Sequence, residues 1–352
     1  MSPSNATAIT ASNKSLANCT LSSQQNHTLN VLPIILGVVT MLSQLFNLTI
    51  FRFWHQKEPF VSLHVLLAFC SLLVGAFGII TPVIRLLPWR EPLSVTFTNL
   101  AAISLEFIHT QSLVTLVAIS VDRWLSVEFP GPYRFHISRR KMRWAIGLSW
   151  VVTMVLTLPG FVVYWADFQA FCNRPVGFVI NSAFHGRQIW AAFHGPVILC
   201  FLLLFQARIV VIAVTVKLRA HLARRRPAVA EQAPRATVVQ LVWGSLRASM
   251  IILFVGLLAD LPFALDIQRL TSSSTVLRIL YMLPILQHIY SPVVYLLFFS
   301  QFRAVLVRAL TFLARSFVER EQRALVPIAN AGFAVASADS VPTDHPARGP
   351  TS

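Results

Sequence analysis

The chain has 352 residues, of which 55% are hydrophobic and only 12% are charged, and its formal net charge is +16. A soluble globular domain carries about 25% charged residues, so this composition excludes an ordinary soluble domain. The basic residues interrupt long apolar runs and are not interleaved with aromatic residues on a polar surface. This pattern is typical of membrane-protein loops and argues against a nucleic-acid partner.

Residues 1–30 are predicted to form an extracellular N-terminal tail that carries glycans. The segment is rich in Ser, Thr and Asn, and its four N-x-S/T sequons are at Asn5, Asn13, Asn18 and Asn26. A fifth sequon, at Asn47, lies within an apolar run and is expected to stay unused. No apolar segment follows a charged start here, so we expect no cleaved signal peptide.

Seven apolar runs follow the tail, each long enough for the roughly 20 residues that span a hydrocarbon core. They cover residues 31–54, 60–86, 95–126, 143–165, 188–217, 238–268 and 275–299. Residues 300–318 then show the apolar spacing of an interfacial helix, and residues 319–352 are expected to be largely disordered. The predicted fold is an all-α membrane protein, a seven-transmembrane helix bundle (31–299) with an amphipathic eighth helix.

The distribution of positive charge predicts the orientation of these runs. Most of the 29 Lys and Arg residues lie in or beside the segments after the first, third, fifth and seventh runs. Positively charged loops stay in the cytoplasm, so the N-terminus is expected outside a multi-pass plasma-membrane protein, as the sequons also indicate. The basic loops would then face the anionic lipids of the inner leaflet.

Asp122, Arg123 and Trp124 end the third apolar run, at the predicted cytoplasmic face. Adjacent residues on a helix do not face each other, but Arg123 is long enough to fold back toward Asp122. Its guanidinium can instead reach backbone carbonyls of a partner when a cleft opens beside it. The simpler alternative is a charge pair that only marks the membrane boundary.

Several landmarks occur in a fixed order along the runs. They are Asn47, LAFCS (67–71), Asp122-Arg123-Trp124, Trp150, Pro196, LPF (261–263) and SPVVY (291–295). Over residues 31 to about 318 this ordered set resembles the class A, rhodopsin-like G-protein-coupled receptors. The resemblance implies a receptor and not an enzyme, which binds an extracellular ligand and activates a heterotrimeric G protein as helix 6 moves outward. It also implies that Asp122, Arg123, Trp124, Pro292 and Tyr295 form the switch.

The chain departs from this family at several switch positions. Ser71 and Ser291 stand where the family usually has Asp and Asn, so a bound sodium ion is not expected, and Asp260 replaces the usual helix 6 Trp. No acidic residue lies between positions 240 and 247 to hold Arg123, so basal signalling is expected. These departures keep open an alternative, a receptor-like protein without G-protein coupling that acts by dimerising with or trafficking another receptor.

Two further features concern subgroup and cysteines. The segments beginning at Glu58 and Ile119 are similar to the Mas-related receptors, and an unassigned orphan receptor is the alternative. The family's helix 3 cysteine is Thr98 here, which leaves Cys172 only Cys19 as an outside partner, and a tail-to-loop disulfide is a hypothesis. The four cysteines lack zinc spacing and no Lys lies in the seventh run, so neither a metal nor a retinal cofactor is expected.

Ionisable residues inside membrane runs are functional candidates by default. The candidate ligand-binding residues are Glu106, His109, His194, Asp260, Asp266 and His288. Several acids around one cavity favour a cationic ligand, an amine or a basic peptide. Three alternatives stay open: His109 and His288 are polar residues bonded between helices, Asp260 is protonated and bonded to His288, or Glu106 pairs with Arg85 or Arg278.

Overall fold

The computed structural model describes residues 23–54, 59–86, 92–165, 168–169, 177–178, 190, 193, 195–225, 247, 249–261, 283–312, 314–316 and 318. It divides the chain into two units, Met1–Phe302 and Arg303–Ser352. Some predicted features lie outside the described residues: Asn5, Asn13, Asn18, Cys19, Cys172, His194, Asp266 and the tail from 319.

The first helix begins earlier than the apolar pattern predicts. A short helix α2 (Ser23–Asn26) and a π-helix η1 (His27–Val31) run directly into α3 (Leu32–Phe53). The Leu32 N–H bonds to the His27 carbonyl, five residues back, just before Pro33. Pro33 has no N–H to direct at Leu29, and the wider π turn lies where an α-helical bond would be missing. Polar residues form this first turn, which is why hydrophobicity alone did not reveal it.

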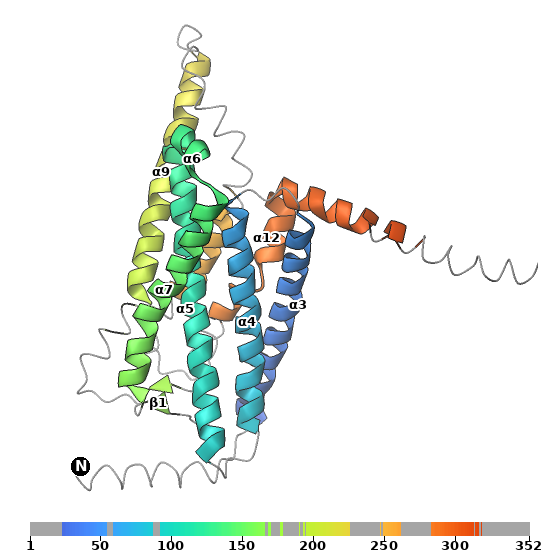
Figure 1. Ribbon diagram of the computed structural model, residues 1–352, viewed down its shortest axis with the longest axis vertical. Coiled ribbons are helices and arrows are strands. Elements are labelled where there is room, and N and C mark those ends of the chain that lie inside the picture. Colours follow the sequence, from blue (N-terminus) through green and yellow to red (C-terminus); the bar gives the residue numbers. More distant parts are fainter. Residues whose placement is uncertain are drawn as a thin grey trace, which may run out of the picture. The chain divides into compact units, whose positions relative to one another are not determined.

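Helices α3, α4 (Val61–Leu86) and α5 (Pro92–Glu128) lie side by side, with α4 in the middle (Figure 1). Helices α3 and α4 lie close together at Gly37 and Gly75, since a Cβ atom on Gly37 would lie 2.8 Å from the Gly75 carbonyl oxygen. Only glycine allows two helix backbones to meet at this distance. The three helices form one face of the bundle.

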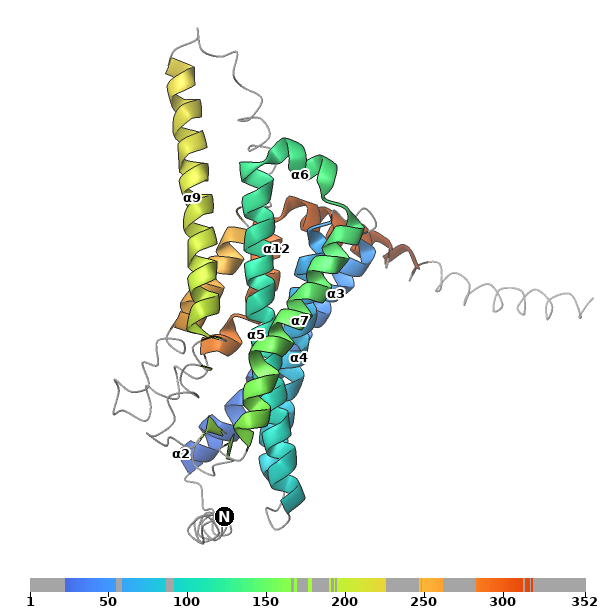
Figure 2. The same ribbon diagram turned by 60° about the vertical axis from the view of Figure 1, so that its left-hand side comes forward.

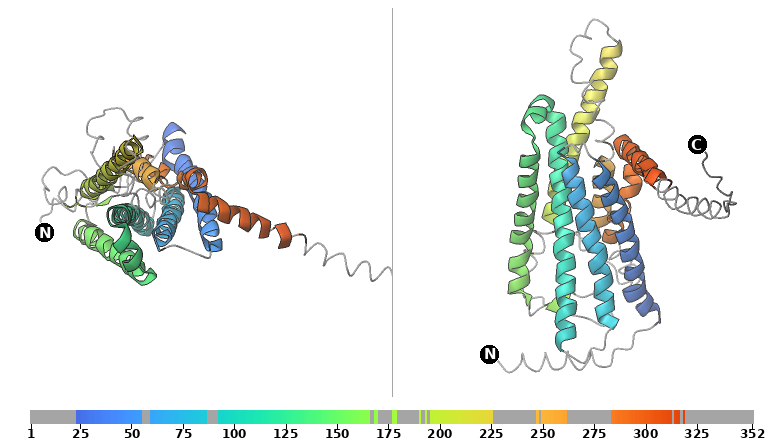
Figure 3. Two further views of the ribbon diagram at one scale, coloured as in Figure 1. Left: turned by 90° about the horizontal axis from the view of Figure 1, so that it is seen from above. Right: turned by 45° about the vertical axis from the view of Figure 1, so that its right-hand side comes forward.

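The chain then turns through α6 (Pro130–His136) into α7 (Arg139–Val163), as Figure 2 shows. The Ser138 side chain caps α7 by accepting a hydrogen bond from the Lys141 N–H. Helices α7 and α9 (Pro196–Arg225) both pack against α5, and the end-on view of Figure 3 shows the helices grouped around it. A two-stranded antiparallel sheet, β1 (Phe168–Gln169) and β2 (Gly177–Phe178), interrupts an otherwise helical fold.

Two more helices occupy the sixth and seventh apolar runs. We call Ser249–Leu261 helix 6 and Leu283–Phe298 helix 7, whose last part is α12 (Ser291–Phe298). A further helix, Ser300–Ser316, follows at the end of the described chain, where an amphipathic helix was predicted.

Four of the described helices are long and apolar enough to cross a membrane, or up to five if the bent pair Leu283–Phe298 and Ser300–Ser316 is one span. Within the described part of the fifth and sixth runs the apolar helices are shorter, Pro196–Ile212 and Ser249–Leu261. Large apolar side chains on α7, among them Val151, Val155 and Val162, are exposed. In a bilayer such a face contacts lipid, so its exposure agrees with a membrane-embedded bundle.

Candidate functional site

Helix 7 breaks inside the bundle, and the break organises the polar core. Residues 287–290 form a turn, after which Pro292 lies in the first turn of α12. Pro292 has no N–H for the His288 carbonyl, four residues earlier. The Gln44 amide, from α3, donates a hydrogen bond to that carbonyl instead. A side chain of another helix thus satisfies the freed backbone group, as the low-polarity interior requires.

Asn47 belongs to the same junction. Its side-chain N–H group donates to the Gln44 amide oxygen and to the Ser291 hydroxyl, each at 3.0 Å, and Gln44 also donates to Ser291 at 3.0 Å. Asn47 is fully buried. This agrees with the expectation that the sequon at Asn47 carries no glycan.

A row of polar contacts crosses the bundle from α4 to helix 6. The Ser71 hydroxyl lies 2.9 Å from His288 Nδ1, and His288 Nε2 lies 3.4 Å from His109 Nδ1. The other nitrogen of His109, Nε2, lies 3.2 Å from the Asp260 carboxylate. Ser71, His288, His109 and Asp260 come from α4, helix 7, α5 and helix 6, so this row, which we call the core relay, ties four helices together.

The core relay bears on two of the three alternatives left open by the sequence, while Arg278 and the side chain of Arg85 lie outside the described residues. Asp260 pairs with His109 and not with His288, whereas the two histidines contact each other between helices. Asp260 is only 2% exposed, and in the described part of the chain its oxygens accept no hydrogen bond of good geometry. A buried carboxylate needs a charged or hydrogen-bonding partner. The His109 ring, 3.2 Å away, is that partner.

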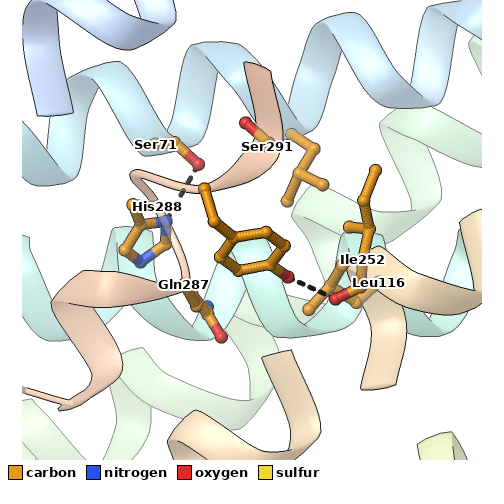
Figure 4. A pocket seen from close by; sticks show the side chains of 8 residues that line it. Ser71, Leu116, Ile252, Gln287, His288 and Ser291 are labelled. Carbon is orange, nitrogen blue, oxygen red and sulfur yellow. Dashed lines mark hydrogen bonds between the residues drawn. The ribbon is translucent and has the colours of Figure 1, made fainter. Parts of the chain in front are cut away.

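A small cavity lies beside the core relay (Figure 4). Ser71, Gln287, His288 and Ser291 line its polar side, and Figure 4 shows His288 directed at Ser71. About 10 Å³ is accessible to a water molecule, which is room for roughly one water. None of the described residues that line it is acidic.

At the other end of the bundle, Arg123 is buried. Its guanidinium folds back onto Asp122, with Nε donating to Oδ2 at 3.0 Å and a second contact through its terminal nitrogen. Tyr133, from α6, donates its hydroxyl proton to the other Asp122 oxygen at 2.7 Å. The Arg123 guanidinium also lies over the Phe60 ring, 4.1 Å from its centre. Only 2% of the Arg123 side chain is exposed. We call this end of the bundle, around Arg123, Asp122, Tyr133 and Phe60, the Arg123 end.

Two further predicted switch residues, Tyr295 and Trp124, lie near it, whereas Pro292 lies at the helix 7 break. The Tyr295 hydroxyl contacts His64 Nδ1 at 2.9 Å, and its ring stacks on Phe302. The Trp124 ring packs against Phe205 of α9, with ring centres 5.6 Å apart. The structure therefore joins Asp122, Arg123 and Tyr295 to one end of the bundle, and Trp124 serves the α5–α9 contact there.

Glu106 lies on α5 one turn before His109, half-buried, and its charge acts on the His109 ring. The predicted ligand residues that the structure describes thus gather as Glu106, His109, Asp260 and His288. Gln44, Phe60 and His64 were missed by the sequence reasoning. Gln44 and His64 could have been recognised from the sequence, because they are polar residues inside apolar runs. Phe60 has no such signal.

Comparison with known proteins decides the family. The model of the family described as "7 transmembrane receptor (rhodopsin family)" matches residues 45–295. The chain belongs to this family. Squid rhodopsin has the same fold, with a TM-score of 0.62 at 15% sequence identity over 84% of this chain and 87% of that one. The protein is therefore a multi-pass membrane protein with the seven-helix receptor fold.

Curated relatives are similar over part of their length. G-protein coupled receptor 26 of the mouse, Mus musculus, is 26% identical over 123 residues, 32% of this chain and 36% of that receptor. The muscarinic acetylcholine receptor M3 of the pig, Sus scrofa, is 26% identical over 175 residues, 46% of this chain and 28% of the relative. The chain thus spans about a third of the length of these relatives. Membership of the Mas-related subgroup stays a prediction from sequence.

Proposed function

We propose that this rhodopsin-family chain is a plasma-membrane receptor with its N-terminus outside, which binds an extracellular ligand and activates a heterotrimeric G protein. The observation that carries the proposal is the burial of Arg123 at the end of α5, folded onto Asp122. A guanidinium with five donors is costly to bury. It is therefore poised to exchange its internal partners for backbone carbonyls of a protein that enters beside it.

Helix 6 supplies the link between ligand and G protein. Asp260 lies near one end of the described helix, in contact with His109 of α5, and Ser249 lies at the other end, near His64 of α4. A rigid helix transmits a displacement at one end to the other. A ligand that separates Asp260 from His109 would thus favour outward movement of helix 6 at the Arg123 end.

The ligand is proposed to be cationic, an amine or a basic peptide. Glu106 and Asp260 place two carboxylates around the single imidazole of His109. Acidic side chains outnumber basic ones in this group of three, which favours a cation. A cationic group that reaches Asp260 would compete with His109 for its carboxylate.

A screen of basic peptides and amines against the four G-protein classes tests this function. We expect at least one cation to activate a G protein in cells that express the chain, and Arg123→Ala to abolish the response at equal surface expression. Arg208→Ala is the matched control, because Arg208 is also on the bundle but 56% exposed, and a surface ion pair such as the one it forms with Glu128 contributes little. No response in any class, or an equal response from Arg123→Ala, would favour a receptor-like partner protein instead.

A further inference from the structure

The start of α4, with Phe60 directly before it, occupies the Arg123 end, and the sequence from 240 to 247 before helix 6 offers no acid to hold the arginine. Phe60 and His64 lie one helical turn apart, and both are buried. Their rings meet edge to face, with centres 5.9 Å apart. They thus form one unit, which we call the α4 latch.

His64 contacts two other helices at once. Its Nδ1 lies 2.9 Å from the Tyr295 hydroxyl of helix 7, and its Nε2 lies 3.5 Å from the Ser249 hydroxyl of helix 6. A neutral imidazole offers one donor and one acceptor, and a hydroxyl can take either role, so both contacts can be satisfied together. Only 3% of His64 is exposed, which leaves little water to compete for them.

Phe60 acts on Arg123 itself. The guanidinium centre lies 4.1 Å from the centre of the Phe60 ring, within the range of a cation–π contact. The other side of Phe60 is supported by Phe299, with ring centres 6.1 Å apart. The latch therefore holds Arg123, Ser249 and Tyr295, one residue each from α5, helix 6 and helix 7.

We propose that Phe60 and His64 are positioning residues that keep the receptor inactive, a latch on α4 in place of an acid on helix 6. The proposal rests on the proposed function, because it assigns the inactive state of the same switch. Outward movement of helix 6 would take Ser249 away from His64, and release of Arg123 would take it off Phe60. The latch thus opposes both steps of activation, and the basal activity expected from the missing acid is reduced.

The test uses the full chain with one variant for each contact. His64→Phe keeps a ring of similar size against Phe60 and Tyr295 but removes both hydrogen bonds. Phe60→Leu keeps apolar volume but removes the ring beneath Arg123, and Phe60→Trp is its matched control because it retains a π face. Ser249→Ala removes only the hydrogen bond between His64 and helix 6.

Two readouts separate failure of the latch from failure of the function. One is basal G-protein activation in cells at equal surface expression. The other needs no G protein: the distance between probes placed by unnatural amino acids at position 247, two residues before helix 6, and at position 140 of α7, whose side chains are exposed. The purified receptor in lipid nanodiscs serves for this measurement.

We expect His64→Phe to raise the ratio of open to closed helix 6 roughly two- to tenfold, the effect of one or two neutral hydrogen bonds. Ser249→Ala should give an equal or smaller rise, because it removes one of the two hydrogen bonds, and it should add nothing to His64→Phe, which already lacks that bond. Phe60→Leu should raise basal activity, whereas Phe60→Trp should stay near the wild type. Unchanged probe distances in His64→Phe and Phe60→Leu would overturn the proposal, even if no G protein is activated by the wild type.

Discussion

The contact between His109 and Asp260 is best tested by a double-mutant cycle on stability. Asp260 is 2% exposed and His109 is 12% exposed, and their charged atoms lie 3.2 Å apart. His109→Leu leaves a buried carboxylate without its partner, which costs about 3–5 kcal/mol. Asp260→Leu should cost less, about 1–2 kcal/mol, because a neutral imidazole tolerates burial and loses only one contact. With both residues replaced by Leu, the cost should largely disappear, since a buried ion pair is often no better than apolar packing.

Thermal unfolding of the purified receptor in detergent measures these differences. Of the two cysteines that the structure describes, Cys70 is buried, so a thiol-reactive fluorescent dye reaches it only when the bundle opens, whereas Cys200 is exposed and contributes a background. We expect the lowest melting midpoint for His109→Leu, an intermediate one for Asp260→Leu, and the double variant above His109→Leu. A His109→Leu receptor that melts like the wild type, or additive losses in the double variant, would refute the pairing.

Three further outcomes follow from the structure. Gly160→Ala should destabilise the protein by about 1–3 kcal/mol or more, because the added Cβ would lie 1.8 Å from the indole of Trp190. The control is Gly147→Ala on the same helix. Its Cβ would meet no atom within 4 Å, so this variant should be neutral or stabilising in the same melting assay. Gln44→Leu should cost about 1–3 kcal/mol by leaving the His288 carbonyl unpaired, and unchanged stability would show that the freed carbonyl needs no donor. Replacing the Asn of each N-terminal sequon by Gln should remove one glycan at a time on electrophoresis, and an unchanged mobility for all four would contradict an extracellular tail.

The sequence predicted the parts of the fold that local patterns encode. Where the structure describes the apolar runs they are largely helical, and the adjacent acid and base at Asp122 and Arg123 fold onto each other as expected. These features depend on hydrophobicity and on the reach of one side chain. The polar beginning of the first helix, at Ser23, and two-residue strands have no such local pattern.

The core relay and the α4 latch depend on which helix faces meet. Pro292 indicated that a carbonyl would be freed, but the donor is Gln44, from a helix 244 residues away. Asp260 was expected to face His288 or a ligand, yet the rotation of helix 6 directs it at His109. Hydrophobic periodicity does not determine such rotations when apolar residues lie all round a helix. The sequence therefore named most polar residues of the core but not their partners.

G-protein activation by the purified receptor tests the central claim most directly. The receptor in lipid nanodiscs would be combined in turn with G proteins of the four classes, and nucleotide exchange measured with and without the cation selected in the screen. The account predicts that exchange by at least one class rises with the wild type and not with Arg123→Ala, while Arg208→Ala behaves as the wild type. Equal exchange with Arg123→Ala, or no exchange with any class, would contradict it.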